Sequence, residues 1–136
     1  MRPLETITLR LEQRGVGVRG KNIVWGTGAD LPTTEPWIVS VTETGGRGPM
    51  DTHNSGSIKQ PTFQVVARAA DARVAAAKID AAYAALGGGD KANQIANLVI
   101  GDVFWLWIKP RSEPFTLTPD TNNRNRIAFN IEGLRR

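Results

Sequence analysis

Cysteine is missing from the 136 residues of this chain, and histidine occurs only once, at His53. The lack of cysteine excludes disulfide bonds and thiolate zinc sites. A single histidine gives little support to a Ser-His-Asp triad or to a metal centre with several histidine ligands. No apolar run reaches the ~18 residues of a membrane-spanning helix. The start, "MRPLETITLRLEQRG", is too charged for the apolar part of a secretion signal. We therefore predict no membrane partner.

The motifs of phosphate binding and catalysis are also incomplete. The segment "GGRG" at 45–48 lacks the Gly-Lys-Ser/Thr ending of a phosphate loop, and no helix is expected to follow it. The carboxylates of Asp80, Asp102, Glu113 and Asp120 are scattered along the sequence without a pairing pattern. The sequence therefore predicts a protein that is not an enzyme and that has no cofactor and no metal site.

Positive charge is in excess, because 17 Lys and Arg residues stand against 13 Asp and Glu residues, and the pI is near 10.0. Several arginines gather late in the chain, namely Arg111, Arg124, Arg126, Arg135 and Arg136. A basic surface suits a nucleic acid or an acidic protein surface as a partner. The simpler interpretation is a solvated surface that keeps the protein in solution.

The first half of the chain predicts one helix and two strands. Residues 3–14 suit an amphipathic helix, with Leu4, Ile7 and Leu11 on one stripe, although Ile7, Leu9 and Leu11 also alternate as in a strand. A short strand is predicted at 23–26, a proline-containing loop at 27–36, and a strand at 37–43.

The middle of the chain predicts a strand followed by the strongest helix. In "TFQVVARAA" at 62–70, Phe63, Val65, Ala67 and Ala69 share one face, as a half-buried strand requires. Asp71 is placed to cap an alanine-rich helix at 72–86, which ends at "GGGD". The expected buried stripe of this helix is Ala75, Ile79, Ala82, Tyr83 and Leu86.

Two further strands are predicted within 96–110, on either side of a bulge or turn at Gly101-Asp102. Strict alternation places Trp105 and Trp107 on one face, and Phe104, Leu106 and Ile108 on the other. Both faces are apolar, which indicates a central strand or one that meets another subunit. An alternative is a platform on which the bases of single-stranded nucleic acid stack, beside Lys109 and Arg111.

The order of elements predicts an α+β fold. A short strand at 114–117, a polar turn at 118–126 and a last strand at 127–134, with Ile127, Phe129 and Ile131 inward, complete the chain. We expect a single domain over 1–136, built as a mostly antiparallel β-sheet with two helices packed against it. Between two of the strands lies a glycine-rich, polar excursion at about 44–60, which is long for a compact domain.

Four segments resemble a known family in their order and spacing. They are "VTETGGRGP" at 41–49, "QPTFQVVAR" at 60–68, "AAAKIDAAYAAL" at 75–86 and "SEPFTLTPDTNNRNRIAFNIEGLRR" at 112–136. Together they resemble the tail terminator proteins of long-tailed bacteriophages, also called minor capsid or tail completion proteins. The resemblance covers roughly residues 37–136. Gln60 stands where the family commonly has arginine, and Thr118-Pro119 stands where it commonly has glycine.

The resemblance implies a structural protein of the virion, located at the head-tail junction and assembled in the host cytoplasm. Such subunits form a ring, usually a hexamer, on the tail tube protein, which ends tail polymerisation. The ring also provides the surface for the head-completion or connector protein, and genomic DNA passes through its channel without sequence-specific binding. A head-completion or connector-stopper protein at the same junction is the alternative, and a basic nucleic-acid-binding module is a further one.

The resemblance also suggests which residues make contacts in the ring. The excursion at 44–60 is expected to form the assembly interface, through Gly45, Gly46, Arg47, Asp51, His53 and Lys59. Its ordering on contact with a neighbour would keep subunits monomeric until a template is present. The alternative is a loop that is only mobile. Channel or ring contacts are expected at Arg124, Arg126, Arg135 and Arg136.

Overall fold

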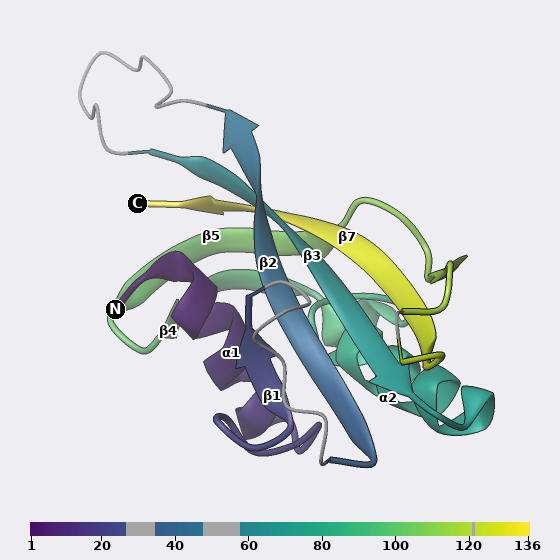
Figure 1. The fold of residues 1–136 in the computed structure, drawn as a ribbon. Helices are drawn as coiled ribbons and strands as arrows, with labels where there is room; N and C mark the ends of the chain where they lie inside the picture. The colour runs from purple at the N-terminus through teal and green to yellow at the C-terminus, as the bar shows by residue number, and fades with distance from the viewer. Residues whose placement is uncertain (27–34, 48–57, 121) are drawn as a thin grey trace.

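The computed structural model describes residues 1–26, 35–47, 58–120 and 122–136. Within them, the chain forms two α-helices and a strongly curled β-sheet, as the α+β prediction requires (Figure 1). The helices are α1 (Pro3–Gln13) and α2 (Ala72–Ala85), and a 3₁₀ turn, η2, covers Lys91–Asn93. The strands are β1 (Ile23–Trp25), β2 (Trp37–Arg47), β3 (Gln60–Ala69), β4 (Ile95–Ile100), β5 (Val103–Pro110), β6 (Phe115–Leu117) and β7 (Asn125–Arg135).

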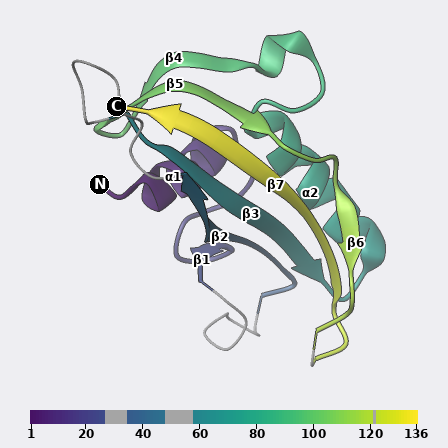
Figure 2. The ribbon, with the colours of Figure 1, turned by 90° about the horizontal axis from the view of Figure 1, so that it is seen from above.

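The sheet is antiparallel except at one edge. Its order is β1-β2-β3-β7-β5-β4, and β1 alone runs parallel to its neighbour, β2. One edge of β7 pairs with β3, while its other edge pairs first with β6 and then with β5 (Figure 2). Strand β7 is therefore the element that joins the two halves of the sheet.

Both helices pack on the same face of the sheet and share one hydrophobic core. The predicted stripe of α1 is confirmed, because Leu4, Ile7 and Leu11 are all buried. In α2, Ile79 and Leu86 are buried against the sheet, and Tyr83 packs edge-on against Phe129. These apolar contacts hold the helices in place, because burial of side chains of this size contributes about 1.5–3 kcal/mol each.

Trp105 lies at the centre of the core and is fully buried. Its ring packs edge-on against Phe63, with 6.4 Å between ring centroids, and its indole Nε1 donates a hydrogen bond to Thr6 Oγ1 at 3.0 Å. A side chain at Gly133 would place its Cβ 2.4 Å from the indole, so only glycine leaves room for Trp105 beneath β7. The largest core side chain thus links α1 to the sheet.

A β-bulge in β5 overturns the predicted division of its faces. Trp105 pairs with Arg135, but Trp107 pairs with Leu134. A step of two residues along β5 therefore matches a step of one residue along β7. Alternation shifts by one residue at this point. Ile108 is consequently buried in the core together with Trp105, whereas Trp107 lies on the opposite face and is only partly buried.

The pair Gly101-Asp102, which was predicted as a bulge or a turn, forms a two-residue turn, since Ile100 and Val103 are partners.

The strand before the excursion is longer than predicted. Strand β2 continues to Arg47, and Arg47 pairs with Gln60, so Gly45, Gly46 and Arg47 belong to a paired strand. Gly45 adopts φ +98° where the register shifts between Glu43 and Gly46, and this conformation favours glycine. The predicted loop residues Asp51 and His53 lie outside the described residues.

Candidate functional site

The face of the sheet that carries no helix is the candidate site, and it is termed the helix-free face (Figure 2). Side chains alternate along β3, so Phe63, Val65 and Ala67 point into the core while Gln64 and Arg68 point the other way. Cross-strand pairing extends this face to Arg126, Ala128, Asn130 and Glu132 of β7, and continued alternation adds Leu134 and, just beyond the strand, Arg136.

Positive charge dominates the helix-free face. Among the described residues, six cationic side chains lie on it or contact its carboxylates, namely Arg68, Lys109, Arg111, Arg124, Arg126 and Arg136, beside two carboxylates, Asp120 and Glu132. The excess of four positive charges equals the formal net charge of the whole chain, +4. The described side chains of this face therefore carry an excess of positive charge, which creates a positive potential there.

The carboxylate of Glu132 is shared by two cations and one amide donor in the middle of this face. Lys109 Nζ lies 3.7 Å from one oxygen, while Arg111 Nε and Gln60 Nε2 lie 3.8 and 3.2 Å from the other. Lys109 Nζ also lies 4.6 Å from the centre of the Trp107 ring. Both cations remain more than half exposed, so these ion pairs contribute little to stability and leave the cations available.

A second carboxylate, Asp120, organises the turn that precedes β7. It accepts hydrogen bonds from the backbone N–H of Asn122 at 3.0 Å and of Arg124 at 2.9 Å, and from Arg124 Nε at 2.9 Å. Burial alone would raise the pKa of this carboxyl, but the donors from Arg124 and Asn122 outweigh burial, and the pKa is lowered. The negative charge of Asp120 is therefore largely committed to Arg124.

Two arginines oppose each other beside this turn. Arg68 of β3 and Arg126 of β7 are directly paired residues, with both side chains on the helix-free face. The Arg68 side chain is only 8% exposed, and its nearest carboxylate oxygen, on Asp120, lies 3.7 Å away. Among the described residues its buried Nε has no hydrogen-bond partner. Burial first, and then the charge of Arg126, lower the pKa of Arg68.

The structure separates the four arginines that were predicted as one group. Arg124 and Arg126 lie on either side of the first residue of β7, while Arg135 is its last residue and Arg136 follows it. The 11 residues of this strand extend over roughly 35 Å at about 3.3 Å per residue. Sequence proximity was misleading because an extended strand moves its two ends far apart.

The end of β7 adjoins the predicted assembly segment. The backbones of Arg135 and Lys59 exchange two hydrogen bonds of 2.9 Å, which places Lys59 beside the C-terminal arginines. The Arg136 guanidinium lies 5.4 Å from the centre of the Phe104 ring. Two of the predicted arginines and one predicted loop residue therefore meet near the end of the β2–β3 pairing at which Arg47 faces Gln60.

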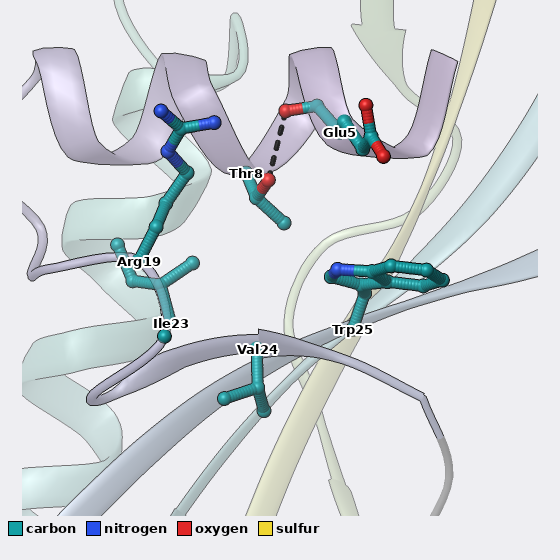
Figure 3. Close-up of a pocket in the computed structure, with 7 residues that line it drawn as sticks. Glu5, Thr8, Arg19, Ile23, Val24 and Trp25 are labelled. Carbon is teal, nitrogen blue, oxygen red and sulfur yellow. Dashed lines mark hydrogen bonds between the residues drawn. The ribbon is translucent and has the colours of Figure 1, made fainter. Parts of the chain in front are cut away.

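A pocket of about 420 Å³ lies on another part of the molecule, between α1 and β1 (Figure 3). Its lining is Glu5, Thr8, Arg19, Gly20, Ile23, Val24 and Trp25. Glu5 accepts a hydrogen bond from the backbone of Arg2, and Arg19 is paired with Glu12 at 3.3 Å. The charged groups of this pocket thus have partners within the protein, so we do not take it as the functional site.

Other classes of site gain no support from the described part of the chain. It contains no group of three or more His, Cys, Asp or Glu side chains that could hold a metal ion, and neither α-helix in it has the length and apolar character needed to cross a membrane. Comparison of the sequence with protein-family models and with curated proteins finds no match.

Proposed function

We propose that this protein is a structural subunit of a bacteriophage virion, which assembles as a ring on the tail tube and ends tail polymerisation. The resemblance of four segments to tail terminator proteins motivates this function. The structural observation that supports it best is the β2–β3 hairpin, whose pairing continues as far as Arg47 and Gln60, beside Lys59 and the end of β7 (Figure 1). The proposed partners are further copies of the chain, usually six in all, the tail tube protein and the head-completion or connector protein.

The edge of β2 explains how such a hairpin would serve assembly. Strand β1 pairs only with Val39–Val41, and Gly26 bonds to Val41 and Thr42. From Glu43 to Arg47 the outer edge of β2 has no strand partner in the described chain. An exposed strand edge offers backbone N–H and C=O groups to another chain. Head-to-tail contacts of this kind close into a ring when the rotation between subunits allows.

The test removes the segment between the strands and keeps the strands. Replacing residues 49–58 with a two-residue Asn-Gly turn keeps Arg47 opposite Gln60 and should leave a folded monomer that neither forms rings nor caps isolated tail tubes. Mass in solution, measured across concentration with and without tubes, reports both properties. A matched variant keeps the length of the segment but replaces all of its residues with Gly and Ser. Comparison of the two variants shows whether assembly requires the side chains of the segment or only its length. Normal ring formation and capping by the shortened variant would contradict the proposal.

A second function is supported by the charge of the helix-free face. A basic nucleic-acid-binding module would bind DNA as a monomer, with affinity that falls steeply as salt increases. Rings that form without nucleic acid would favour the terminator, whereas a strict monomer that ignores tail tubes and binds DNA would favour the module. Both readouts use the same purified protein, so one set of measurements decides between the two functions.

A further inference from the structure

The paired arginines on the helix-free face lack a counter-charge of their own. Like charges directly opposite each other on neighbouring strands are destabilising, yet Arg68 and Arg126 stand in this position. The adjacent carboxylate, Asp120, already accepts three hydrogen bonds from the turn at 120–124. The guanidinium groups of Arg68 and Arg124 therefore share one committed carboxylate, with Arg126 paired to Arg68 beside them, and the cluster keeps an excess positive charge.

We propose that Arg68, Arg124 and Arg126 form a binding site for a phosphate group of a nucleic-acid backbone. Arg126 presents the accessible part of the site, because it is partly exposed and, among the described residues, only its Nε is engaged, with Thr118 O at 2.7 Å. Arg68 lies behind it, largely buried, and strengthens the local positive potential. The Asp120 turn holds the largely buried Arg124 side chain in place.

The remainder of the helix-free face favours a long polyanion over an isolated oxyanion. Further cations follow along the sheet at Lys109, Arg111 and Arg136, up to the far end of β7. Uncharged Gln64 and Asn130 are paired residues between the two groups of cations. Arg, Lys, Asn and Gln side chains are the usual donors to backbone phosphates, and such contacts do not depend on base sequence.

The inference rests on the proposed function only for its biological place, where this face would meet the DNA that passes through the ring. The interaction itself is a property of one subunit, so it is measured on the isolated protein. A short, fluorescently labelled DNA duplex of arbitrary sequence is the probe, and fluorescence anisotropy reports binding across a range of NaCl concentrations.

The decisive comparison is between Arg126→Gln and Arg14→Gln, which remove the same charge from opposite faces. Arg14 is exposed at the end of α1, on the helix-bearing side of the sheet. Loss of one charged hydrogen-bonding contact predicts that Arg126→Gln binds the duplex about tenfold more weakly at low salt. The slope of log affinity against log salt should fall by about one. Arg14→Gln should retain the wild-type slope.

Several outcomes would overturn the inference. Equal weakening in both variants would show that only net charge matters. Inorganic phosphate could instead protect the wild type against thermal unfolding in a way that depends on Arg126, while the duplex does not bind. That result would assign the site to a free oxyanion. Binding of polyglutamate as tight as that of DNA, with the same dependence on Arg126, would assign it to an acidic protein. Ring formation without DNA binding would refute this inference and leave the proposed function standing; DNA binding without rings would do the reverse.

Discussion

At the scale of single residues, Trp105 depends on one polar contact. Its indole N–H donates to Thr6 Oγ1 in a fully buried position, so Thr6→Val leaves that donor without a partner. We expect this substitution to lower the free energy of unfolding by about 1–3 kcal/mol. Thr8→Val is the matched control, because Thr8, like Thr6, donates to a carbonyl three residues earlier in α1 but accepts no indole. Equal losses in a denaturant titration would contradict the prediction.

Asp120 gives a residue-scale prediction for acid. Its pKa in the folded protein is lowered, so its contribution to stability is present above the ordinary carboxyl pKa and is lost as pH falls through the lower folded value. The wild type should therefore lose stability below about pH 4. Asp120→Asn should be less stable at pH 7 and should lack this part of the acid response. The free energies of unfolding of both proteins, measured from pH 7 down to acidic pH, test this prediction. Parallel curves for the two proteins would contradict the assignment of the acid response to Asp120.

At the scale of elements, α2 depends on its cap. Asp71 accepts a hydrogen bond from the backbone N–H of Arg73 at 2.9 Å, which satisfies a donor at the start of the helix. Asp71→Ala should lower the free energy of unfolding by about 1 kcal/mol. Asp80→Ala, an exposed position within the same helix, makes the same charge change without removing a cap. A larger effect at position 80 would show that charge, and not capping, controls the helix.

The same scale explains what the sequence could predict. Helix α2 and strands β3 and β7 were predictable because apolar residues recur with the period of the element and because Asp71 and Gly87 mark the helix ends. Strand β5 was predicted with the wrong faces, since the bulge after Trp105 depends on its pairing with β7 and has no glycine signal of its own. Strand β2 was predicted too short, because Gly45 and Gly46 were interpreted as the start of a loop.

The candidate site could be predicted only in part. Arg124 and Arg126 were singled out from the basic end of the sequence, but their neighbour Arg68 was not. The proximity of Arg68 depends on the register of β3 against β7, which pairs Arg68 with Arg126, 58 positions later in the sequence. The available signal was a lone charged residue, an arginine, among the uncharged residues of β3. The separation of Arg135 and Arg136 from the other two follows from the extended conformation of β7, which the prediction of a last strand already contained.

At the scale of the whole molecule, concentration of positive charge on one face predicts a response to salt. Repulsion among the cations of the helix-free face opposes folding, and salt screens charges over about 10 Å at 0.1 M. The free energy of unfolding should therefore rise as NaCl increases from low ionic strength. The rise should be smaller in Arg126→Gln than in Arg14→Gln. A flat or falling dependence for the wild type would contradict the prediction.

The position of β7 also governs the order in which the chain can fold. The β2–β3 and β4–β5 hairpins each join strands that are close in sequence, so either can form early as a local unit. Neither hairpin pairs with the other, and the two become a single sheet only when β7 enters between β3 and β5. The contact of Val65 with Phe129 spans 64 residues, and closing so long a loop is slow. Until β7 is in place, the inner edges of β3 and β5 stay open to other chains.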